Sequence, residues 1–136
     1  MKKTILLVDD EIDILDIQNR YLIQAGYDVL VAHDGKEGLE LFRKKSIDLI
    51  ITDIMMPNID GYDFISEVQY IAPDQPFLFT TAKTSEQDKI YGLSLGADDF
   101  IVKPFSPREL VLRVNNILRR LSRGGETEPV SYTHLR

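Results

Sequence analysis

Residues 5–10 of this 136-residue chain have the sequence Ile-Leu-Leu-Val-Asp-Asp, in which four aliphatic side chains in a row end at two carboxylates. Residues 49–53, Leu-Ile-Ile-Thr-Asp, repeat this layout. A short apolar run without polar alternation is typical of a strand buried on both faces of a parallel sheet. We therefore expect five strands, at residues 5–8, 29–32, 49–52, 77–80 and 100–102.

The segments between these runs have the spacing of amphipathic helices. The apolar residues expected on one helix face are Ile14, Leu15, Ile17, Tyr21 and Leu22 in the first helix and Phe64, Ile65, Val68 and Ile71 after the third strand. The last helix is expected to start at about Pro107, with Ser106 as its N-cap and an apolar stripe from Leu110 to Leu121. Alternating strands and helices predict an α/β fold, with a parallel sheet covered by helices on both faces.

The length suits one domain with its own hydrophobic core. We place the end of this domain near residue 121, because residues 122–129 lack apolar periodicity and favour a flexible linker. Residues 130–136, Val-Ser-Tyr-Thr-His-Leu-Arg, alternate apolar and polar side chains, as the first strand of a truncated second domain would. A disordered terminus or a cloning remnant is the alternative interpretation of this tail.

The composition excludes several classes of protein. Twenty-two acidic and sixteen basic residues give a net charge of −6, so this segment by itself is not expected to bind DNA. The absence of cysteine excludes disulfides and thiolate metal sites. No apolar run approaches the roughly 20 residues of a membrane-spanning helix, and no export signal is evident, so a cytoplasmic location without membrane contact is expected by elimination.

Chemically active side chains follow four of the predicted strands: Asp9 and Asp10, then Asp53, Thr81 and Lys103. The carboxyl ends of parallel strands share one edge of the sheet, where ligands of open α/β sheets bind, so these residues are expected to converge in one cleft. Three clustered carboxylates repel one another unless a cation lies between them, and an open site of oxygen ligands suits Mg²⁺.

A lysine charge and a threonine hydroxyl beside this cluster can bind phosphoryl oxygens. The set therefore predicts phosphoryl transfer to a carboxylate. Taken singly, an Asp after a strand is more often a turn former or helix cap, Thr81 could be a cap, and Lys103 a solvated charge. Their joint placement at matched strand ends favours the functional interpretation. Met55 and Met56 are expected in loop or packing roles, and His33 and His134 have no partners at metal-ligand spacing.

Four blocks of sequence resemble the signature blocks of response-regulator receiver domains. They are residues 6–11 (Leu-Leu-Val-Asp-Asp-Glu), 53–61 (Asp-Ile-Met-Met-Pro-Asn-Ile-Asp-Gly), 81–82 (Thr-Ala) and 96–105 (Gly-Ala-Asp-Asp-Phe-Ile-Val-Lys-Pro-Phe). The resemblance covers residues 4–121. It implies a flavodoxin-like (βα)5 doubly wound sandwich, with a parallel sheet in the strand order 2-1-3-4-5.

The resemblance also implies a role for each site residue. Asp53 would be the nucleophile that takes phosphate from the phosphohistidine of a sensor histidine kinase. Asp10 and Asp53 would bind Mg²⁺ together with the backbone carbonyl of Met55, and Asp9 would act through water. The domain would then be a phosphoacceptor that takes part in its own phosphoryl transfer and slow autodephosphorylation, and would not be a metabolic enzyme.

Further implied features concern the switch between states. Thr81 and Lys103 would contact the bound phosphoryl group, and the Lys103-Pro104 peptide bond would be cis. Gly61 would close the turn after the phosphorylation loop. The switch aromatic, often tyrosine in the family, is Phe100 here, so its ring could swing inward when Thr81 moves but could not form a polar latch.

The region of the fifth strand and the last helix resembles the OmpR/PhoB subfamily, which implies a dimer formed on phosphorylation and a winged-helix output domain that binds DNA. DNA would be bound only through that domain, whose reading helix is not in this chain; a stand-alone receiver acting by protein contact is the alternative. The expected dimer face consists of Lys89, Ile90, Leu93, Asp99, Glu109, Leu112 and Arg113. Leu112 and the pair Ile90 and Leu93 point away from the predicted core faces of their helices. The alternative is that Leu112 is an isolated surface leucine.

Two other classes use related features. A Mg²⁺-dependent phosphatase with an aspartyl nucleophile would have a second Asp two residues after the first, but position 55 is methionine. A flavin- or nucleotide-binding module would have a Gly- or Ser/Thr-rich loop after the first strand, and this chain has Asp9-Asp10-Glu11 there. The sequence therefore favours the receiver over both.

Overall fold

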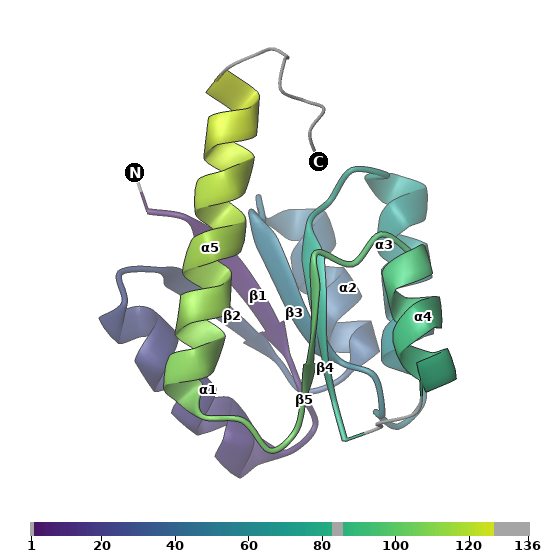
Figure 1. Ribbon diagram of the computed structural model, residues 1–136. Coiled ribbons are helices and arrows are strands. Elements are labelled where there is room, and N and C mark those ends of the chain that lie inside the picture. Colours follow the sequence, from purple (N-terminus) through teal and green to yellow (C-terminus); the bar gives the residue numbers. More distant parts are fainter. Residues whose placement is uncertain (1, 83–85, 127–136) are drawn as a thin grey trace.

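The computed structural model describes residues 2–82 and 86–126 (Figure 1). The strands are β1 (Thr4–Val8), β2 (Asp28–Ala32), β3 (Leu49–Asp53), β4 (Phe77–Thr81) and β5 (Asp99–Val102). The helices are α1 (Ile12–Gln24), α2 (Gly35–Lys44), α3 (Gly61–Ile71), α4 (Glu86–Ser94) and α5 (Pro107–Glu126). All neighbouring strands are parallel, in the order β2-β1-β3-β4-β5, which confirms the expected doubly wound fold.

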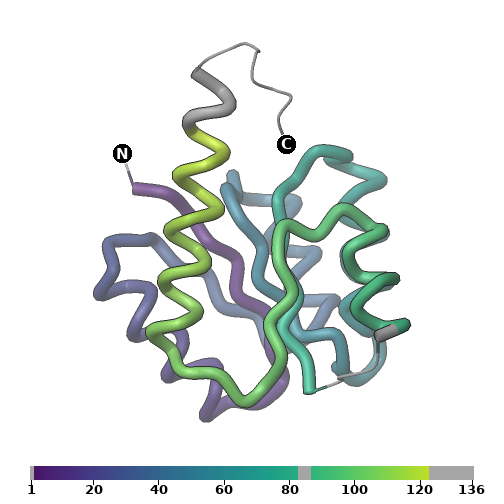
Figure 2. The backbone as a smooth tube through the Cα atoms, in the orientation of Figure 1, coloured from purple at the N-terminus to yellow at the C-terminus, as the bar shows by residue number. Residues whose placement is uncertain are grey.

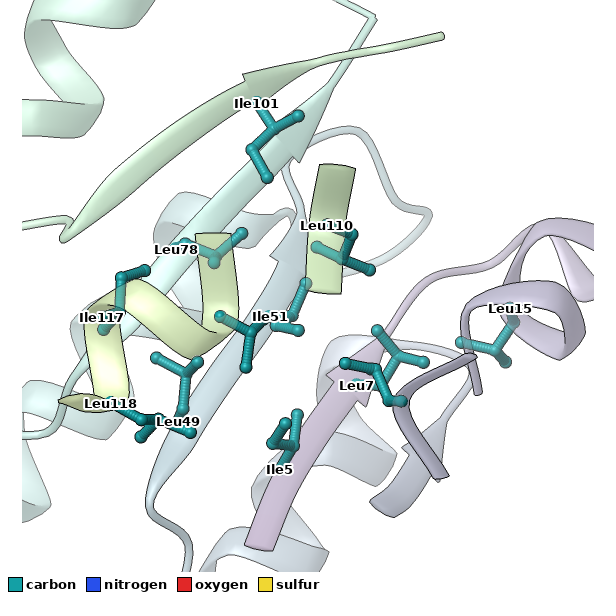
Figure 3. Close-up of a cluster of buried hydrophobic side chains, with 12 residues drawn as sticks. Ile5, Leu7, Leu15, Leu49, Ile51, Leu78, Ile101, Leu110, Ile117 and Leu118 are labelled. Atoms are coloured by element: carbon teal, nitrogen blue, oxygen red, sulfur yellow. The ribbon is translucent and has the colours of Figure 1, made fainter. Parts of the chain in front are cut away.

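The sheet is covered on both faces because side chains alternate along each strand. Ile5 and Leu7 of β1 belong to a core that includes Leu15 and Leu22 of α1 and four buried residues of α5 (Figure 3). Leu6 and Val8 point to the other face and join residues of α2 and α3 there. Helices α1 and α5 thus lie on one face, and α2, α3 and α4 on the other (Figure 1).

The buried face of α1 differs from the predicted one. Leu15 and Leu22 are buried as expected, but Ile17 is 46% exposed and Gln18 is buried. At 100° per residue, positions 15, 18 and 22 fall within a 60° arc, and position 17 lies 100° away from the nearest of them. Ile17 instead lines a groove of about 240 Å³ with Phe105.

Helix α5 begins as the sequence predicts but ends later. Ser106 accepts a hydrogen bond at Oγ from the backbone N–H of Glu109, which is the expected N-cap. The helix then continues from residue 121 to Glu126, through the start of the predicted linker, so a linker beginning at 122 is wrong for residues 122–126. Extending an existing helix adds one hydrogen bond for each residue that is fixed, so it is far more favourable than starting a new one. A glycine in a helix is only about 1 kcal/mol less favourable than an alanine, so the Gly124-Gly125 pair does not end α5. Figure 2 shows the coloured part of α5 running alongside the sheet.

The expected linker after Glu126 and the expected strand at 130–136 lie outside the described residues. Whether a second domain begins there therefore stays a prediction. No helix within residues 2–82 and 86–126 is both long and apolar enough to span a membrane.

Candidate functional site

The strand register brings the predicted site residues to one edge of the sheet. Val8, the last residue of β1, pairs with Thr52, so Asp9 and Asp53 lie side by side just beyond this pair. At the other side of β3, the last residue of β4, Thr81, pairs with Val102, which directly precedes Lys103. The convergence that the sequence predicts is therefore present in the structure.

Asp9, Asp10 and Asp53 form a compact group of carboxylates. Each offers one oxygen, and these oxygens all lie within 4.8 Å of one another. Asp9 and Asp53 are buried, whereas Asp10 is exposed and opens the group to solvent. Buried carboxylates this close repel one another and have lost their hydration, so the group favours binding of a cation.

Lys103 supplies part of that positive charge. Its Nζ lies 3.0 Å from Asp9 Oδ2, 3.1 Å from Glu11 Oε1 and 3.2 Å from Asp53 Oδ2. Burial by itself would lower the pKa of the ammonium, but the hydrogen bonds and charges of the three carboxylates outweigh burial, so the pKa of Lys103 is raised. One ammonium among three carboxylates leaves the cluster with an excess of negative charge.

Glu11 is a site residue that the sequence reasoning missed. Its backbone N–H donates a 2.9 Å hydrogen bond to Asp9 Oδ1, a local turn that keeps residue 11 at the sheet edge, near Lys103. The signal is present in the acidic run Asp9-Asp10-Glu11, whose third carboxylate directly follows the two predicted site residues.

Asp53 has two oxygens in different environments. Oδ2 accepts the hydrogen bond from Lys103, while Oδ1 is buried and accepts none from the described residues. The backbone N–H of Met55 lies near enough to lower the pKa of this carboxyl slightly, without completing a hydrogen bond to Oδ1. Burial is the strongest influence, the Lys103 charge opposes it and the Asp9 charge adds to it, so the pKa is raised from 3.8 to about 6.

The loop after Asp53 is closed tightly against the strand. Gly61 donates a 2.8 Å hydrogen bond from its N–H to the carbonyl of Ile54, as expected for the residue that closes this turn. A Cβ added to Gly61 would lie 2.3 Å from the carbonyl oxygen of Asp53, so only glycine fits. Met55, in the same loop, has a 53% exposed side chain, and the expected metal contact of its carbonyl stays a prediction.

Thr81 and Phe100, the expected switch pair, are both buried. Thr81 is fully enclosed, and its carbonyl accepts a 2.7 Å hydrogen bond from the N–H of Lys103. The Lys103-Pro104 bond is cis, as the resemblance implied. Phe100 is 8% exposed and lies edge-on to Phe79, with ring centroids 6.4 Å apart. The ring therefore already occupies an interior position, which differs from the outward start that an inward swing requires.

The residues of the expected dimer face fall into two groups. Ile90, Leu93 and Leu112 are exposed, by 59%, 45% and 62%, and Lys89 is exposed too. Arg113, in contrast, forms its ion pairs within the chain: Nη1 lies 2.8 Å from Asp99 Oδ2, and Nη2 lies 3.0 Å from Glu109 Oε2. The apolar residues are therefore exposed, as the expected dimer face requires, whereas Arg113 could pair with a second subunit only by exchanging these internal ion pairs.

The sequence matches the family described as the response regulator receiver domain over residues 5–115. The chain belongs to this family. It is a receiver domain of a two-component response regulator, as the four sequence blocks indicated.

Relatives of this receiver domain agree with the assignment. It is 50% identical over 126 residues to the response regulator SaeR of Staphylococcus epidermidis. The match covers 93% of this chain and 55% of that protein. The chain thus spans about half the length of the curated relatives that it matches.

Solved structures also resemble this receiver domain. The CheY-like receiver domain protein of Methanospirillum hungatei has a TM-score of 0.85 and 29% identity, covering 90% of this chain and 98% of that one. The regulator DrrB, an OmpR/PhoB homologue of Thermotoga maritima, has a TM-score of 0.81 and 28% identity, covering 89% of this chain and 54% of that one. The second likeness agrees with the subfamily that the sequence suggested.

Proposed function

We propose that Asp53 accepts a phosphoryl group from the phosphohistidine of a sensor histidine kinase. The main support is that the two carboxylate oxygens of Asp53 differ. Oδ2 accepts a hydrogen bond from Lys103, whereas Oδ1 is buried and accepts no hydrogen bond from the described residues. An oxygen without a partner, beside a fixed ammonium, is suited to act as a nucleophile.

Mg²⁺ fits the same cluster. The excess of carboxylates over Lys103 and the exposed Asp10 form an open, oxygen-rich site, which suits an ion that keeps several waters. Asp10 and Asp53 would hold the ion directly, with the Met55 carbonyl, and Asp9 would act through water. When bound, Mg²⁺ supplies positive charge that offsets the charge of the incoming phosphoryl oxygens.

The residues of the chain then have defined tasks. Oδ1 of Asp53 forms a new P–O bond while the P–N bond to the histidine breaks and the imidazole nitrogen keeps the electron pair. Lys103 redirects one N–H from a carboxylate to a phosphoryl oxygen, and the Thr81 hydroxyl donates to another. The domain takes part in this transfer and in slow autodephosphorylation, and acts as a phosphoacceptor in the cytoplasm.

The signal is proposed to pass through a dimer. Ile90 and Leu93 on α4 and Leu112 on α5 are exposed apolar side chains. Exposed apolar surface of this kind is typical of a contact between subunits. We infer that the receiver extends to the end of α5 and that the residues after it connect it to a DNA-binding output domain. A stand-alone receiver acting only by protein contact is the second candidate; the sequence that follows residue 136 distinguishes the two.

Intact mass after incubation with acetyl phosphate and Mg²⁺ tests the central proposal. The wild-type protein should gain one phosphoryl group, and Asp53→Asn should gain none. A gain in both proteins would place the acceptor elsewhere, and a gain in neither would remove the proposed function.

A further inference from the structure

Helix α4 is held to the domain by little apolar burial. Among its described side-chain positions, 87–94, Gly92 alone is buried, and Ile90, Tyr91 and Leu93 are 59%, 48% and 45% exposed. Helices of globular proteins owe most of their stability to packing of an apolar face. Something other than a buried face must therefore fix the position of α4.

Two hydrogen bonds from α3 reach both ends of α4. The Tyr62 hydroxyl donates to the carbonyl of Asp88 at 3.3 Å, and Gln69 Nε2 donates to the carbonyl of Leu95 at 2.6 Å. The donors are seven residues apart, as are the acceptors, which is about two helical turns. Because α3 and α4 lie next to each other on the same face of the sheet (Figure 1), matched spacing lets one helix hold the other at two points.

Ring contacts fix the first of these points. The Tyr62 ring is edge-on to Tyr91 of α4, with centroids 4.7 Å apart, and edge-on to Phe79 of β4, at 5.4 Å. Gly92 lets the helix approach this cluster, since a Cβ there would lie 3.0 Å from the Phe100 ring. The Tyr62 ring is therefore held between the sheet and α4, with its hydroxyl at the first turn of the helix.

Tyr62 is also the residue that follows the phosphorylation loop. The preceding residue, Gly61, donates a hydrogen bond from its N–H to the Ile54 carbonyl. It packs so closely against the Asp53 backbone that even a Cβ would not fit. Because this backbone contact is tight, a shift of the loop that contains Asp53 and Ile54 would also move Tyr62. Phe100 has no hydroxyl and is already buried, so it offers no comparable polar contact to α4.

We propose that Tyr62 and Gln69 form a clamp that holds α4 in its resting position, and that Tyr62 transmits movement of the phosphorylation loop to α4. The two residues are positioning residues, since neither touches the acceptor carboxylate. The transmitting role rests on the proposed function of Asp53, whereas the clamp itself does not.

Hydrogen exchange of the unphosphorylated protein tests the clamp. Tyr62→Phe and Gln69→Leu should each raise the exchange rates of the backbone amides of residues 90–95 about two- to tenfold, the change that the loss of one hydrogen bond corresponds to. Tyr70→Phe is the matched control, because Tyr70 lies on the same helix and is 90% exposed. Amides of β3 report global stability. Rates at 90–95 that stay at the wild-type value, or that rise no more than those of β3, would overturn the clamp.

Labelling by acetyl phosphate tests the transmitting role. Tyr62→Phe should be phosphorylated about two- to tenfold faster than wild type, because α4 no longer resists the change, while Tyr70→Phe should match wild type. Equal rates for Tyr62→Phe and wild type would overturn the transmitting role while leaving the proposed function intact. No labelling of wild type would instead remove the proposed function and this role with it, and the exchange experiment would still decide the clamp.

Discussion

Lys103 Nζ lies 3.2 Å from Asp53 Oδ2, although the two residues are 50 positions apart in the sequence and their side chains are only 12% and 6% exposed. The same nitrogen contacts Asp9. A single lysine therefore partners two buried carboxylates. Removing Lys103 would leave the buried carboxylates of Asp9 and Asp53 without a compensating positive charge. Losing one partner of a buried ion pair destabilises a protein far more than replacing both partners by apolar residues.

We predict that Lys103→Met destabilises the metal-free protein by about 3 kcal/mol, the lower end of the range for such a loss, because the cluster is open to solvent at Asp10. Urea unfolding in EDTA measures the change, with Lys36→Met as the control because Lys36 is exposed on α2. Equal stability of the two variants would mean that solvent, and not Lys103, compensates the carboxylates.

The raised pKa of Asp53 predicts a dependence of stability on pH. The folded protein holds the Asp53 proton up to about pH 6, whereas the unfolded chain releases it near 3.8, so stability falls as pH rises between these values. The shift in the pKa of Asp53 corresponds to a loss of roughly 3 kcal/mol in the free energy of unfolding. This loss is absent well below pH 3.8 and complete well above pH 6.

Asp53→Asn removes this titration. In EDTA we expect the variant to exceed wild type in free energy of unfolding at pH 7.5, with a difference that shrinks steadily as the pH falls to 4. Asp74→Asn, at an exposed position, should show no such trend. A difference that is constant across the range would contradict the burial of Asp53 as its cause.

Most of the fold could be predicted from sequence because it depends on local patterns. Each strand begins or ends within one residue of its apolar run, and Ser106 caps α5 as its position before Pro107 suggests. The convergence of Asp9 and Asp53 followed from the rule that parallel strands share one carboxyl edge. Neither inference needed a particular side-chain contact.

The features that sequence did not reveal are those that depend on tertiary contacts. The burial of Gln18 in place of Ile17 depends on the angle at which α1 packs. The interior position of Phe100 depends on the absence of a side chain at Gly92, eight residues earlier. The ion pairs of Arg113 with Asp99 and Glu109 look equally suited, from spacing alone, to partners in another subunit.

Magnesium should be required for labelling, because phosphoryl oxygens and Asp53 are both anionic and their approach without a cation costs several kcal/mol. Excess EDTA should abolish the mass gain from acetyl phosphate, and Asp10→Ala should reduce it at least about tenfold at fixed Mg²⁺. Asp74→Ala, which also removes one exposed carboxylate, should be labelled like wild type. Labelling of wild type that persists in EDTA would show that the Asp9, Asp10 and Asp53 group does not serve as a metal site.

Dimer formation tests the exposed apolar residues of α4 and α5. Beryllofluoride with Mg²⁺, used as a phosphoryl mimic, should convert a monomer into a symmetric dimer through Ile90, Leu93 and Leu112, because contact with a second copy would bury their exposed apolar area. Leu112→Glu and Ile90→Glu should keep the protein monomeric at concentrations where wild type dimerises, since each would place a charge in the apolar contact.

Sedimentation velocity with and without the mimic measures this change. Tyr70→Glu is the control, because it adds the same charge at a 90% exposed position on α3. It should dimerise like wild type. The internal ion pairs of Arg113 predict a further detail: Arg113→Ala should weaken the dimer less than Leu112→Glu, since an exchange between internal and intersubunit pairs gains little. A wild-type monomer in both states at high micromolar concentration, or a dimer unaffected by the α4 and α5 charges, would show that this surface has another role.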